Sequence, residues 1–261
     1  MMTFDSSQLI SWISYYFFPF VRILALIAAS PVFNEKQFPN RVKIGLAALT
    51  TFIITPHIPL NDTPLLEPLS FWLLIQQILI GVMMGLMLQL AFVSIRIAGE
   101  LIGLQMGLSF AVFFDPSGGP NMPVLARFLN ILAILLFLTF QGHLWLFSML
   151  VDSFSILPIS TNQLNADGLI ILVKAGTNMF VHGLLFALPL IAVLLLMNIT
   201  MGILNRMTPQ LSVFVVGFPL SLFMGIYVLG LLLPQIVPFF ESLFADFFLL
   251  LQAMLSALAI N

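Results

Sequence analysis

Between Lys174 and Glu241 the sequence contains a single charged residue, Arg206. The uncharged stretches on either side of it, residues 175–205 and 207–240, are both longer than the roughly 20 apolar residues that cross a bilayer as a helix. Over the whole chain 61% of the residues are hydrophobic, 7% are charged and the mean hydropathy is +1.15, whereas soluble domains carry about 25% charged residues. The chain is therefore predicted to be an all-α, polytopic integral membrane protein of long, kinked helices and helical hairpins.

The composition also excludes several classes of function. The chain has no cysteine, which excludes disulfides and cysteine-ligated metals. Its net charge is -2 and its eight basic residues are scattered, so no basic patch for nucleic acid is present. His-Glu-x-x-His and Gly-x-Ser-x-Gly motifs are absent, and we expect no catalytic residue, no metal and no cofactor. No Lys or Arg precedes Arg22, so we expect the first helix to be kept rather than cleaved as a secretory signal.

The first apolar segment, residues 11–31, contains Arg22 near its middle. Either this face packs against protein, or the side chain extends to the membrane surface; both would lower the cost of a charge in the bilayer. The next apolar segment, residues 44–55, is short for a membrane span. A conventional layout of the chain has six spans.

Residues 69–115 contain no proline. As one helix they would be about 70 Å long, more than twice the hydrocarbon thickness of a bilayer. Either the helix breaks near Gly99 to Gly103, or it stands clear of the bilayer against other subunits. Gly81 and Gly85 form a small-xxx-small pair, which is typical of closely packed helices.

Residues 96–127 concentrate charge, glycine and proline between two long uncharged segments. Arg96 and Glu100 are four residues apart and so share a helix face, which predicts a buried ion pair. Gly99, Gly103 and Gly107 recur at the same spacing, and we expect them to form a face along which another backbone packs closely.

The aromatic run from Phe110 to Phe114 is followed by the breakers of residues 115–120, so a helix is predicted to end near Phe114. Asn121 and Pro123 are suited to start the next helix. Unpaired backbone groups are costly at membrane depth. We therefore interpret residues 110–122 as a loop that points into an assembly or a pore, the alternative being an ordinary surface loop.

Residues 128–151 are uninterrupted by charge and long enough to span the membrane. In this segment His143 is interpreted as an interfacial hydrogen-bonding residue rather than a proton relay, because no acid lies nearby in the sequence. Residues 175–240 are predicted to form a helical hairpin with its turn at residues 206–210 and kinks at Pro189 and Pro219. Residues 239–261, which follow Pro234 and Pro238, are expected to form another helix.

Three stretches resemble one family in their order and spacing. They read Phe38-Pro-Asn-Arg-Val-Lys-Ile-Gly-Leu-Ala, then Gly99-Glu-Leu-Ile-Gly-Leu-Gln-Met-Gly followed by Phe114-Asp-Pro, then Arg206-Met-Thr-Pro-Gln-Leu-Ser-Val-Phe-Val-Val-Gly-Phe-Pro. Together with Gly142-His143-Leu144, they are similar to the FliR family, the R component of the flagellar export gate and of its type III secretion relatives. The resemblance covers essentially the whole chain.

The resemblance implies a non-enzymatic subunit of the export gate in the bacterial inner membrane, at the flagellar basal body. Such a subunit forms part of a protein-conducting pore, assembles helically with the homologous P and Q gate proteins and contacts the B protein. Its cargo would be unfolded flagellar proteins, and it would also contact membrane lipid but no nucleic acid. Members of the family are largely lifted out of the bilayer plane, which would account for a segment longer than the bilayer is thick.

The same resemblance implies one export-gate domain over residues 1–261. Residues 1–160 would hold the first helices and a plug loop at 106–122, and residues 161–261 the C-terminal hairpin and a tail helix. A second set of residues is expected to form the hairpin turn and to contact partner subunits. The plug positions are Phe110, Phe113, Phe114, Asp115, Pro116, Gly118 and Gly119, and the hairpin positions are Arg206, Pro209, Gln210, Gly217 and Pro219.

A small-solute secondary transporter is the main alternative, with its binding site at the break near Asp115. Such transporters often carry paired discontinuous helices in two halves of the chain. The Gly-Glu and Asp-Pro patterns occur here without a second copy, which disfavours this class.

Overall fold

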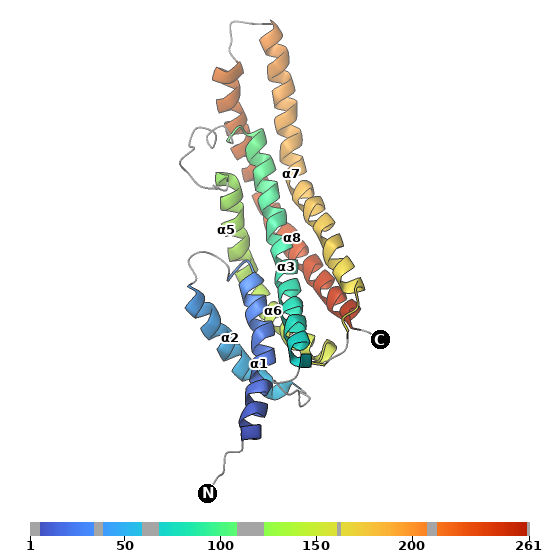
Figure 1. The fold of residues 1–261 in the computed structure, drawn as a ribbon. Coiled ribbons are helices and arrows are strands. Elements are labelled where there is room, and N and C mark those ends of the chain that lie inside the picture. The colour runs from blue at the N-terminus through green and yellow to red at the C-terminus, as the bar shows by residue number, and fades with distance from the viewer. Residues whose placement is uncertain are drawn as a thin grey trace. The chain divides into compact units, whose positions relative to one another are not determined.

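The computed structural model describes residues 6–33, 39–58, 68–108, 123–160, 163–207 and 213–259, and every regular element within them is a helix. The all-α prediction is thus confirmed. In chain order the elements are α1 (Ser6–Ala29), α2 (Asn40–Ile54), the short 3-10 helix η1 (Thr55–His57), α3 (Pro68–Gln105), α5 (Val124–Thr139), α6 (Gly142–Ile156), α7 (Asp167–Met207) and α8 (Val213–Leu258) (Figure 1).

Three of the described helices, α3, α7 and α8, are long and apolar enough to cross a membrane. The broken pair of α5 and α6 would supply a fourth crossing if it acts as one span. The 15 residues of α2 would rise only about 22 Å, which is less than the thickness of the hydrocarbon layer. The described residues therefore provide three or four candidate spans rather than the six of the conventional layout.

The internal contacts divide the chain into two compact units, each built from separate parts of the sequence. Unit 1 comprises Met1–Leu90, Gln141–Gly176 and Asp246–Asn261, and unit 2 comprises Ala91–Phe140 and Thr177–Ala245. Both units take residues from each side of position 160, and the division of the chain at that position stays a prediction. That the whole chain acts as one functional domain stays a prediction.

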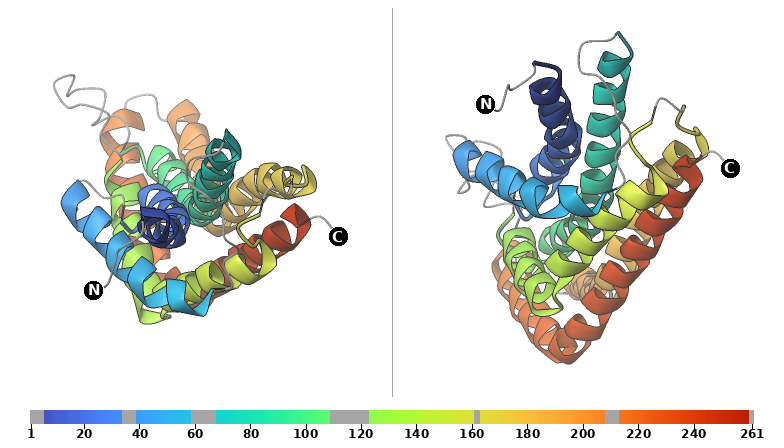
Figure 2. Two further views of the ribbon diagram at one scale, coloured as in Figure 1. Left: turned by 60° about the horizontal axis from the view of Figure 1, so that its bottom comes forward. Right: turned by 90° about the horizontal axis from the view of Figure 1, so that it is seen from below.

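In unit 1, α1 lies alongside the first part of α3 (Figures 1 and 2). The glycine pair of α3 permits this packing: a Cβ atom added at Gly81 would collide with the carbonyl oxygen of Arg22, and one added at Gly85 would lie 2.5 Å from Cβ of Ala29. In both views of Figure 2, α6 runs beside the end of α8, where the rings of Trp145 and Phe248 are 6.3 Å apart. The predicted close packing at the small-xxx-small pair is confirmed.

In unit 2, an aromatic cluster joins three helices. The ring of Phe92 on α3 lies 5.6 Å from that of Phe137 on α5 and 5.3 Å from that of Phe244 on α8. The rings of Phe137 and Phe244 are themselves 5.2 Å apart. Each pair is within the range in which aromatic rings attract beyond their burial, so this cluster fixes α3, α5 and α8 against each other.

The predicted hairpin is formed by α7 and the first part of α8. Phe186 of α7 lies 4.9 Å from Phe239 and 5.8 Å from Phe240 of α8, measured between ring centroids. However, Pro234 and Pro238 do not end the second arm, because α8 continues through both to Leu258. The separate tail helix expected at residues 239–261 is therefore the C-terminal part of α8. A proline removes one backbone hydrogen bond, and in a helix of 46 residues the remaining bonds carry the helix past it.

The span expected at residues 128–151 is interrupted. α5 ends at Thr139 and α6 begins at Gly142, with Gln141 between them in the left-handed backbone region at φ 57°. Outside glycine this region is uncommon and costs about 1–2 kcal/mol. The two helices meet at a bend of 66°. The uncharged run carried no signal for this bend, because hydrophobicity reports membrane affinity and not the direction of the backbone.

Candidate functional site

The C-terminal end of α3 is closed by a glycine cap. Leu108 N–H donates to the Gly103 carbonyl at 3.0 Å, Gly107 N–H donates to the Leu104 carbonyl at 3.0 Å, and Gly107 has a φ of 79°. These are the two hydrogen bonds and the left-handed residue of a Schellman motif. α3 itself therefore ends at Gln105, with Gly107 in its cap. The helix end predicted near Phe114 lies outside the described residues, and the role of the glycine face in packing stays a prediction.

α3 runs without interruption through Gly99 and Gly103 and ends at Gln105, so the first of the two alternatives, a break near these glycines, is met only as a helix end just beyond them. The 38 residues of α3 give a length of about 57 Å, which still exceeds the hydrocarbon thickness. A helix of this length extends beyond the bilayer or tilts strongly within it.

The capped end of α3 is anchored in the core of unit 2. A Cβ atom at Gly225 of α8 would lie 2.6 Å from Cγ of Met106, so the absence of a side chain there makes room for Met106. Ser221 Oγ also donates to the Met106 carbonyl at 3.4 Å. Met106 also belongs to a hydrophobic core cluster formed by α3 and α7. The buried residues of this cluster are Ala98, Ile102, Met106, Ala187, Leu190 and Leu194.

The next helix begins against the same part of α3. Pro123 is the N-cap of α5, and its ψ of 144° places it outside the helix. A Cβ atom at Gly99 would lie 2.5 Å from Cα of Ala126, and one at Gly103 would lie 4.0 Å from Cβ of Leu125. The two described ends of the chain on either side of residues 109–122 are thus both held within unit 2.

All seven predicted plug residues lie outside the described residues. They are Phe110, Phe113, Phe114, Asp115, Pro116, Gly118 and Gly119. Their role stays a prediction, and what the structure adds is the anchored position of the chain at Leu108 and at Pro123.

Arg96 and Glu100 lie one turn apart on α3, as expected. Glu100 is exposed, whereas Arg96 is half-buried and its Nε atom is buried without a hydrogen-bond partner. Among the described residues the structure records no ion pair between them. A buried donor without a partner costs about 1–3 kcal/mol, so this guanidinium is under-satisfied in the isolated chain. The pairing of Arg96 with Glu100 stays a prediction.

The predicted hairpin residues are distributed over the two arms and the turn. Arg206 is exposed in the last turn of α7, where a cation also suits the negative end of the helix dipole. Gly217 is half-buried and Pro219 exposed, both inside α8. Pro209 and Gln210 lie outside the described residues.

Arg22 is fully buried in unit 1 and joins three helices. Its Nε donates to Gln77 Oε1 of α3 at 2.7 Å, while Nη1 and Nη2 donate to the carbonyls of Ser153 and Leu157 at the end of α6, both at 2.9 Å. The guanidinium carbon also lies 4.2 Å from the ring centroid of Phe154. Of the two alternatives for Arg22, the structure shows the first: this face of α1 packs against protein, and the side chain does not extend to the membrane surface.

The charge of Arg22 is balanced without a carboxylate. Among the described residues it makes no ion pair, and the groups that surround it are carbonyl oxygens, an amide and an aromatic ring. The carbonyls belong to the C-terminal end of α6, where the helix dipole is equivalent to about half a negative charge. Sequence reasoning missed Gln77, Ser153 and Leu157, since two of these contacts are made by backbone carbonyls.

His143 lies at the start of α6, just after the bend at Gln141. Its Nδ1 is buried and has no hydrogen-bond partner among the described residues, while the neighbouring Trp145 is exposed. The described residues contain no group of three or more His, Cys, Asp or Glu residues that could hold a metal ion. No partner for a proton relay through His143 is recorded in the described part of the chain.

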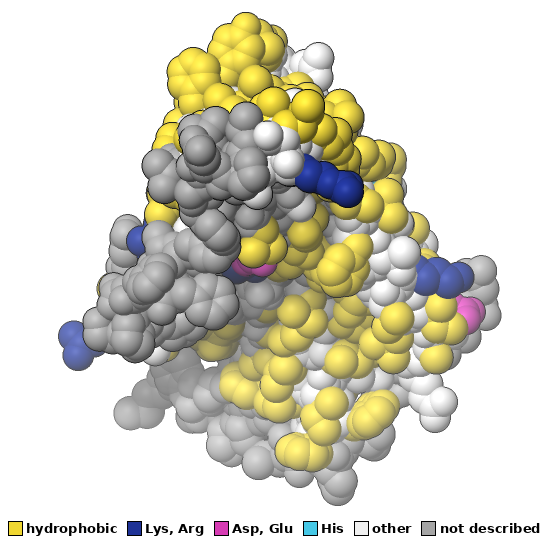
Figure 3. Space-filling model, turned by 90° about the horizontal axis from the view of Figure 1, so that it is seen from above, with side chains coloured by type: hydrophobic (Ala, Val, Ile, Leu, Met, Phe, Trp, Pro, Cys, Tyr) yellow, Lys and Arg dark blue, Asp and Glu magenta, His cyan; other side chains and the backbone are white. Residues whose placement is uncertain are grey.

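Most of the described surface in Figure 3 consists of hydrophobic side chains, with few charged ones among them. Such a surface is unstable in water, and α3, α7 and α8 are long enough to carry it through a bilayer. The fold is therefore that of an all-α, polytopic integral membrane protein.

Comparison with known proteins defines the family. The family model described as bacterial export proteins, family 1, matches residues 13–247. The flagellar biosynthetic protein FliR of Pectobacterium carotovorum subsp. carotovorum is 60% identical, and that of Escherichia coli K12 52% identical, each over 99% of both chains. The FliR protein of Bacillus subtilis strain 168 is 30% identical over 78% of this chain and 80% of its own. The chain belongs to the FliR family of bacterial export proteins and is a membrane component of the flagellar export apparatus.

Proposed function

We propose that the chain is a non-enzymatic subunit of the inner-membrane export gate at the flagellar basal body, and that it forms part of the protein-conducting pore. The observation that carries this proposal is the match to flagellar FliR proteins over nearly the whole length of the chain. The P and Q gate proteins and the B protein are its proposed partners, and unfolded flagellar proteins are its proposed cargo.

We further propose that residues 106–122 form the plug of the resting pore. The chain leaves α3 through the cap at Gly107, whose neighbour Met106 is buried beside Gly225, and it returns at Pro123 beside the Gly99–Ala126 contact. Anchored ends would let the intervening residues move without displacing α3 or α5. Phe110, Phe113 and Phe114 supply apolar bulk, and an apolar constriction blocks ions by dewetting without a charged gate.

Ion conductance tests this proposal. The gate complex is reconstituted with the intact chain or with residues 110–114 deleted, and conductance per assembled complex is measured. We expect the deletion to leave co-purification with the P and Q proteins intact and to raise resting conductance at least tenfold. Replacing the exposed Phe180 of α7 by Ala is the control and should leave the conductance unchanged. A deletion that assembles normally and does not leak contradicts the plug.

Co-purification itself tests the wider proposal. If the intact chain, extracted in detergent, does not co-purify with the P and Q proteins, it is not a gate subunit, whatever the conductance.

A further inference from the structure

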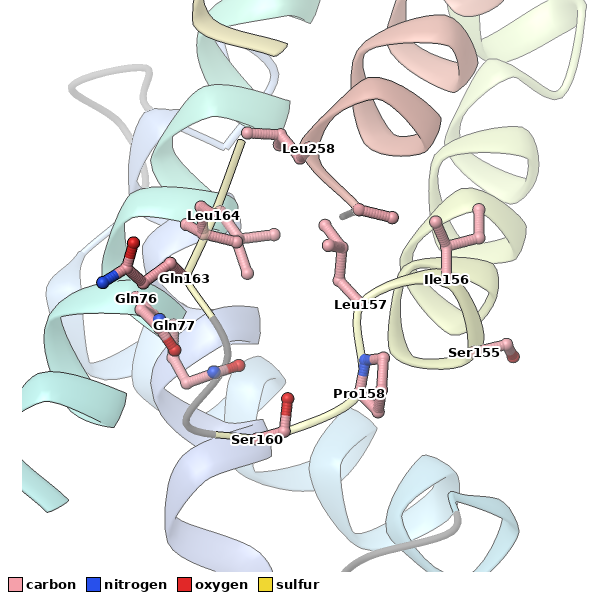
Figure 4. A pocket seen from close by; sticks show the side chains of 12 residues that line it. Gln76, Gln77, Ser155, Ile156, Leu157, Pro158, Ser160, Gln163, Leu164 and Leu258 are labelled. Atoms are coloured by element: carbon pink, nitrogen blue, oxygen red, sulfur yellow. The ribbon is translucent and has the colours of Figure 1, made fainter. Parts of the chain in front are cut away.

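A cavity of about 320 Å³ lies within unit 1, at the beginning of α3 and the ends of α6 and α8 (Figure 4). The segment that links α6 to α7 closes another side of it. Since a water molecule occupies about 30 Å³ in the liquid, the space exceeds what one or two bridging waters would need. None of the residues discussed for the plug, the glycine face or the hairpin lines it.

One wall of the cavity carries an amide whose orientation is fixed. Arg22 can only donate hydrogen bonds, so the atom of Gln77 that lies 2.7 Å from its Nε must be the carbonyl oxygen Oε1. The other end of the amide is then Nε2, a donor with two hydrogens. Gln77 is 99% buried, and the structure records no partner for Nε2 among the described residues.

Gln77 Nε2 is therefore a donor available to whatever occupies the cavity. The charged guanidinium on Oε1 polarises the amide, and a polarised amide donates a stronger hydrogen bond. Further polar groups lie along the rim, since Ser160 and Gln163 also line the cavity. A ligand that displaces water from the cavity would leave this donor unpaired, at a cost in free energy, unless the ligand brings an acceptor. This wall therefore favours a ligand with an acceptor.

The opposite wall is apolar. Figure 4 shows the side chains of Ile156 and Leu157 on one side of the cavity and those of Gln76 and Gln77 on the other, with Leu164 and Leu258 above them. An occupant must therefore present a hydrogen-bond acceptor to one wall and an apolar group to the other. Both requirements are met by a residue with an apolar side chain and its own backbone carbonyl.

The charges around the cavity distinguish between classes of occupant. No Lys, Arg, Asp or Glu is among the described residues that line it. The Arg22 guanidinium behind Gln77 has its Nε, Nη1 and Nη2 engaged by other groups. Lipid phosphates are held by Lys and Arg, and ionised side chains need a charged partner when buried. The lining thus favours a neutral peptide over an anionic lipid headgroup.

We propose that this cavity binds an uncharged peptide segment of another protein. An apolar side chain of that segment packs on Ile156 and Leu157, and a backbone carbonyl accepts a hydrogen bond from Gln77 Nε2. The inference rests on the proposed function only for the expected source of the segment, which is another subunit of the export gate.

Photo-crosslinking from the rim of the cavity tests the proposal. Gln163, which is exposed, is replaced by a benzophenone-bearing amino acid in cells that produce the full chain. The adduct is purified through a tag on this chain, and the crosslinked peptide is identified by mass spectrometry. We expect an adduct to an uncharged segment of a different protein.

The decisive variant is Gln77→Glu. A Glu side chain still accepts from Arg22 Nε but replaces the free donor with an acceptor, so the fold is retained and the hydrogen bond to the peptide is lost. We expect the adduct yield to fall at least fivefold, and to fall similarly when Ser160→Phe fills the cavity. Gln252→Glu, the same change at an exposed position of α8, is the control and should leave the yield unchanged.

An adduct to lipid only, an adduct within this chain only, no adduct, or a protein adduct that Gln77→Glu leaves unchanged would each overturn the proposal. A Gln77-dependent adduct to a protein outside the export gate would support the binding site and contradict only the expected source. Failure of the intact chain to co-purify with the P and Q proteins would count against the proposed function and not against the site.

Discussion

Gly99 of α3 and Ala126 of α5 are in such close contact that a Cβ atom on Gly99 would lie 2.5 Å from Cα of Ala126. The neighbour at this point is backbone, which cannot rotate away as a flexible side chain would. Ala126 is the third residue of α5, so this contact positions the start of the helix that follows the proposed plug.

Gly99→Leu should therefore separate α3 from α5 and destabilise unit 2. Overpacking of a well-packed site typically costs about 1–3 kcal/mol, and the backbone contact places this site at the upper end of that range. The midpoint of thermal unfolding in detergent would measure the loss. Gly230→Leu in α8, where a Cβ atom would meet nothing within 4 Å, is the matched control. Equal midpoints for the two variants would contradict a close helix contact at Gly99.

The helices themselves were predictable because their signal is local. Long uncharged runs identified α3, α7 and α8, since burying charge in a bilayer is costly at any position of a span. The hairpin of α7 and α8 and the close packing at Gly81 and Gly85 were also predictable. Small residues at a spacing of four produce a flat helix face whatever the partner is.

The ends of the helices were less predictable. The residues from Leu108 to Phe114 continue the apolar pattern of α3, but the cap at Gly107 ends the helix before them. A glycine in a helical pattern can either pack closely or adopt a positive φ, and only the surrounding backbone decides between the two. The bend at Gln141 was hidden for another reason: a residue without glycine's freedom takes the left-handed conformation there, and no sequence signal marks it.

The partners of Arg22 could not be predicted from the sequence, because two of its four acceptor atoms are backbone carbonyl oxygens. The backbone carbonyl of a residue at a helix end can accept a hydrogen bond whatever side chain that residue carries. The sequence signal that does exist is weak: Gln77 is one of two adjacent glutamines in an otherwise apolar stretch of α3.

Replacing Arg22 should destabilise unit 1 more than any other single change to a basic residue of the described chain. Arg22→Ala removes the donors for Gln77, Ser153 and Leu157 together, and leaving a buried acceptor unpaired costs about 1–3 kcal/mol for each group. Arg22→Lys should lose a large part of this as well, because one ammonium group cannot reach acceptors that lie along different edges of the planar guanidinium. Unfolding midpoints in detergent would rank the variants. Arg206→Ala, at the exposed end of α7, serves as the control and should change the midpoint little.

The hairpin turn is proposed to contact partner subunits. Substitutions in the turn and in one arm of the hairpin test this. Pro209→Leu or Gly217→Leu should lower the yield of complex with the P and Q proteins severalfold while membrane insertion stays normal. Gly217 is half-buried within α8, so a larger side chain there changes the surface that the arm presents. Gly176→Leu in α7, at a position where a Cβ atom would meet nothing within 4 Å, controls for adding bulk to a helix. Normal assembly of both hairpin variants would favour an ordinary turn.

The pairing of Arg96 with Glu100 is a prediction about the assembled complex. In the chain alone Arg96 Nε is buried without a hydrogen bond and Glu100 is exposed, so a partner that covers Glu100 would remove water from both and strengthen their attraction. Arg96→Ala and Glu100→Ala should each lower the yield of complex, since each leaves one charge uncompensated in the covered interface.

The double variant separates pairing from independent roles. If the two side chains pair, removing both should recover part of the yield lost by either, with a coupling of about 0.5–3 kcal/mol in the double-mutant cycle. Combining Glu100→Ala with Arg206→Ala, whose arginine lies on another helix, should show no such coupling. Full additivity of the losses at Arg96 and Glu100 would mean that the two residues act separately, with Arg96 Nε satisfied in the complex by a group of another subunit.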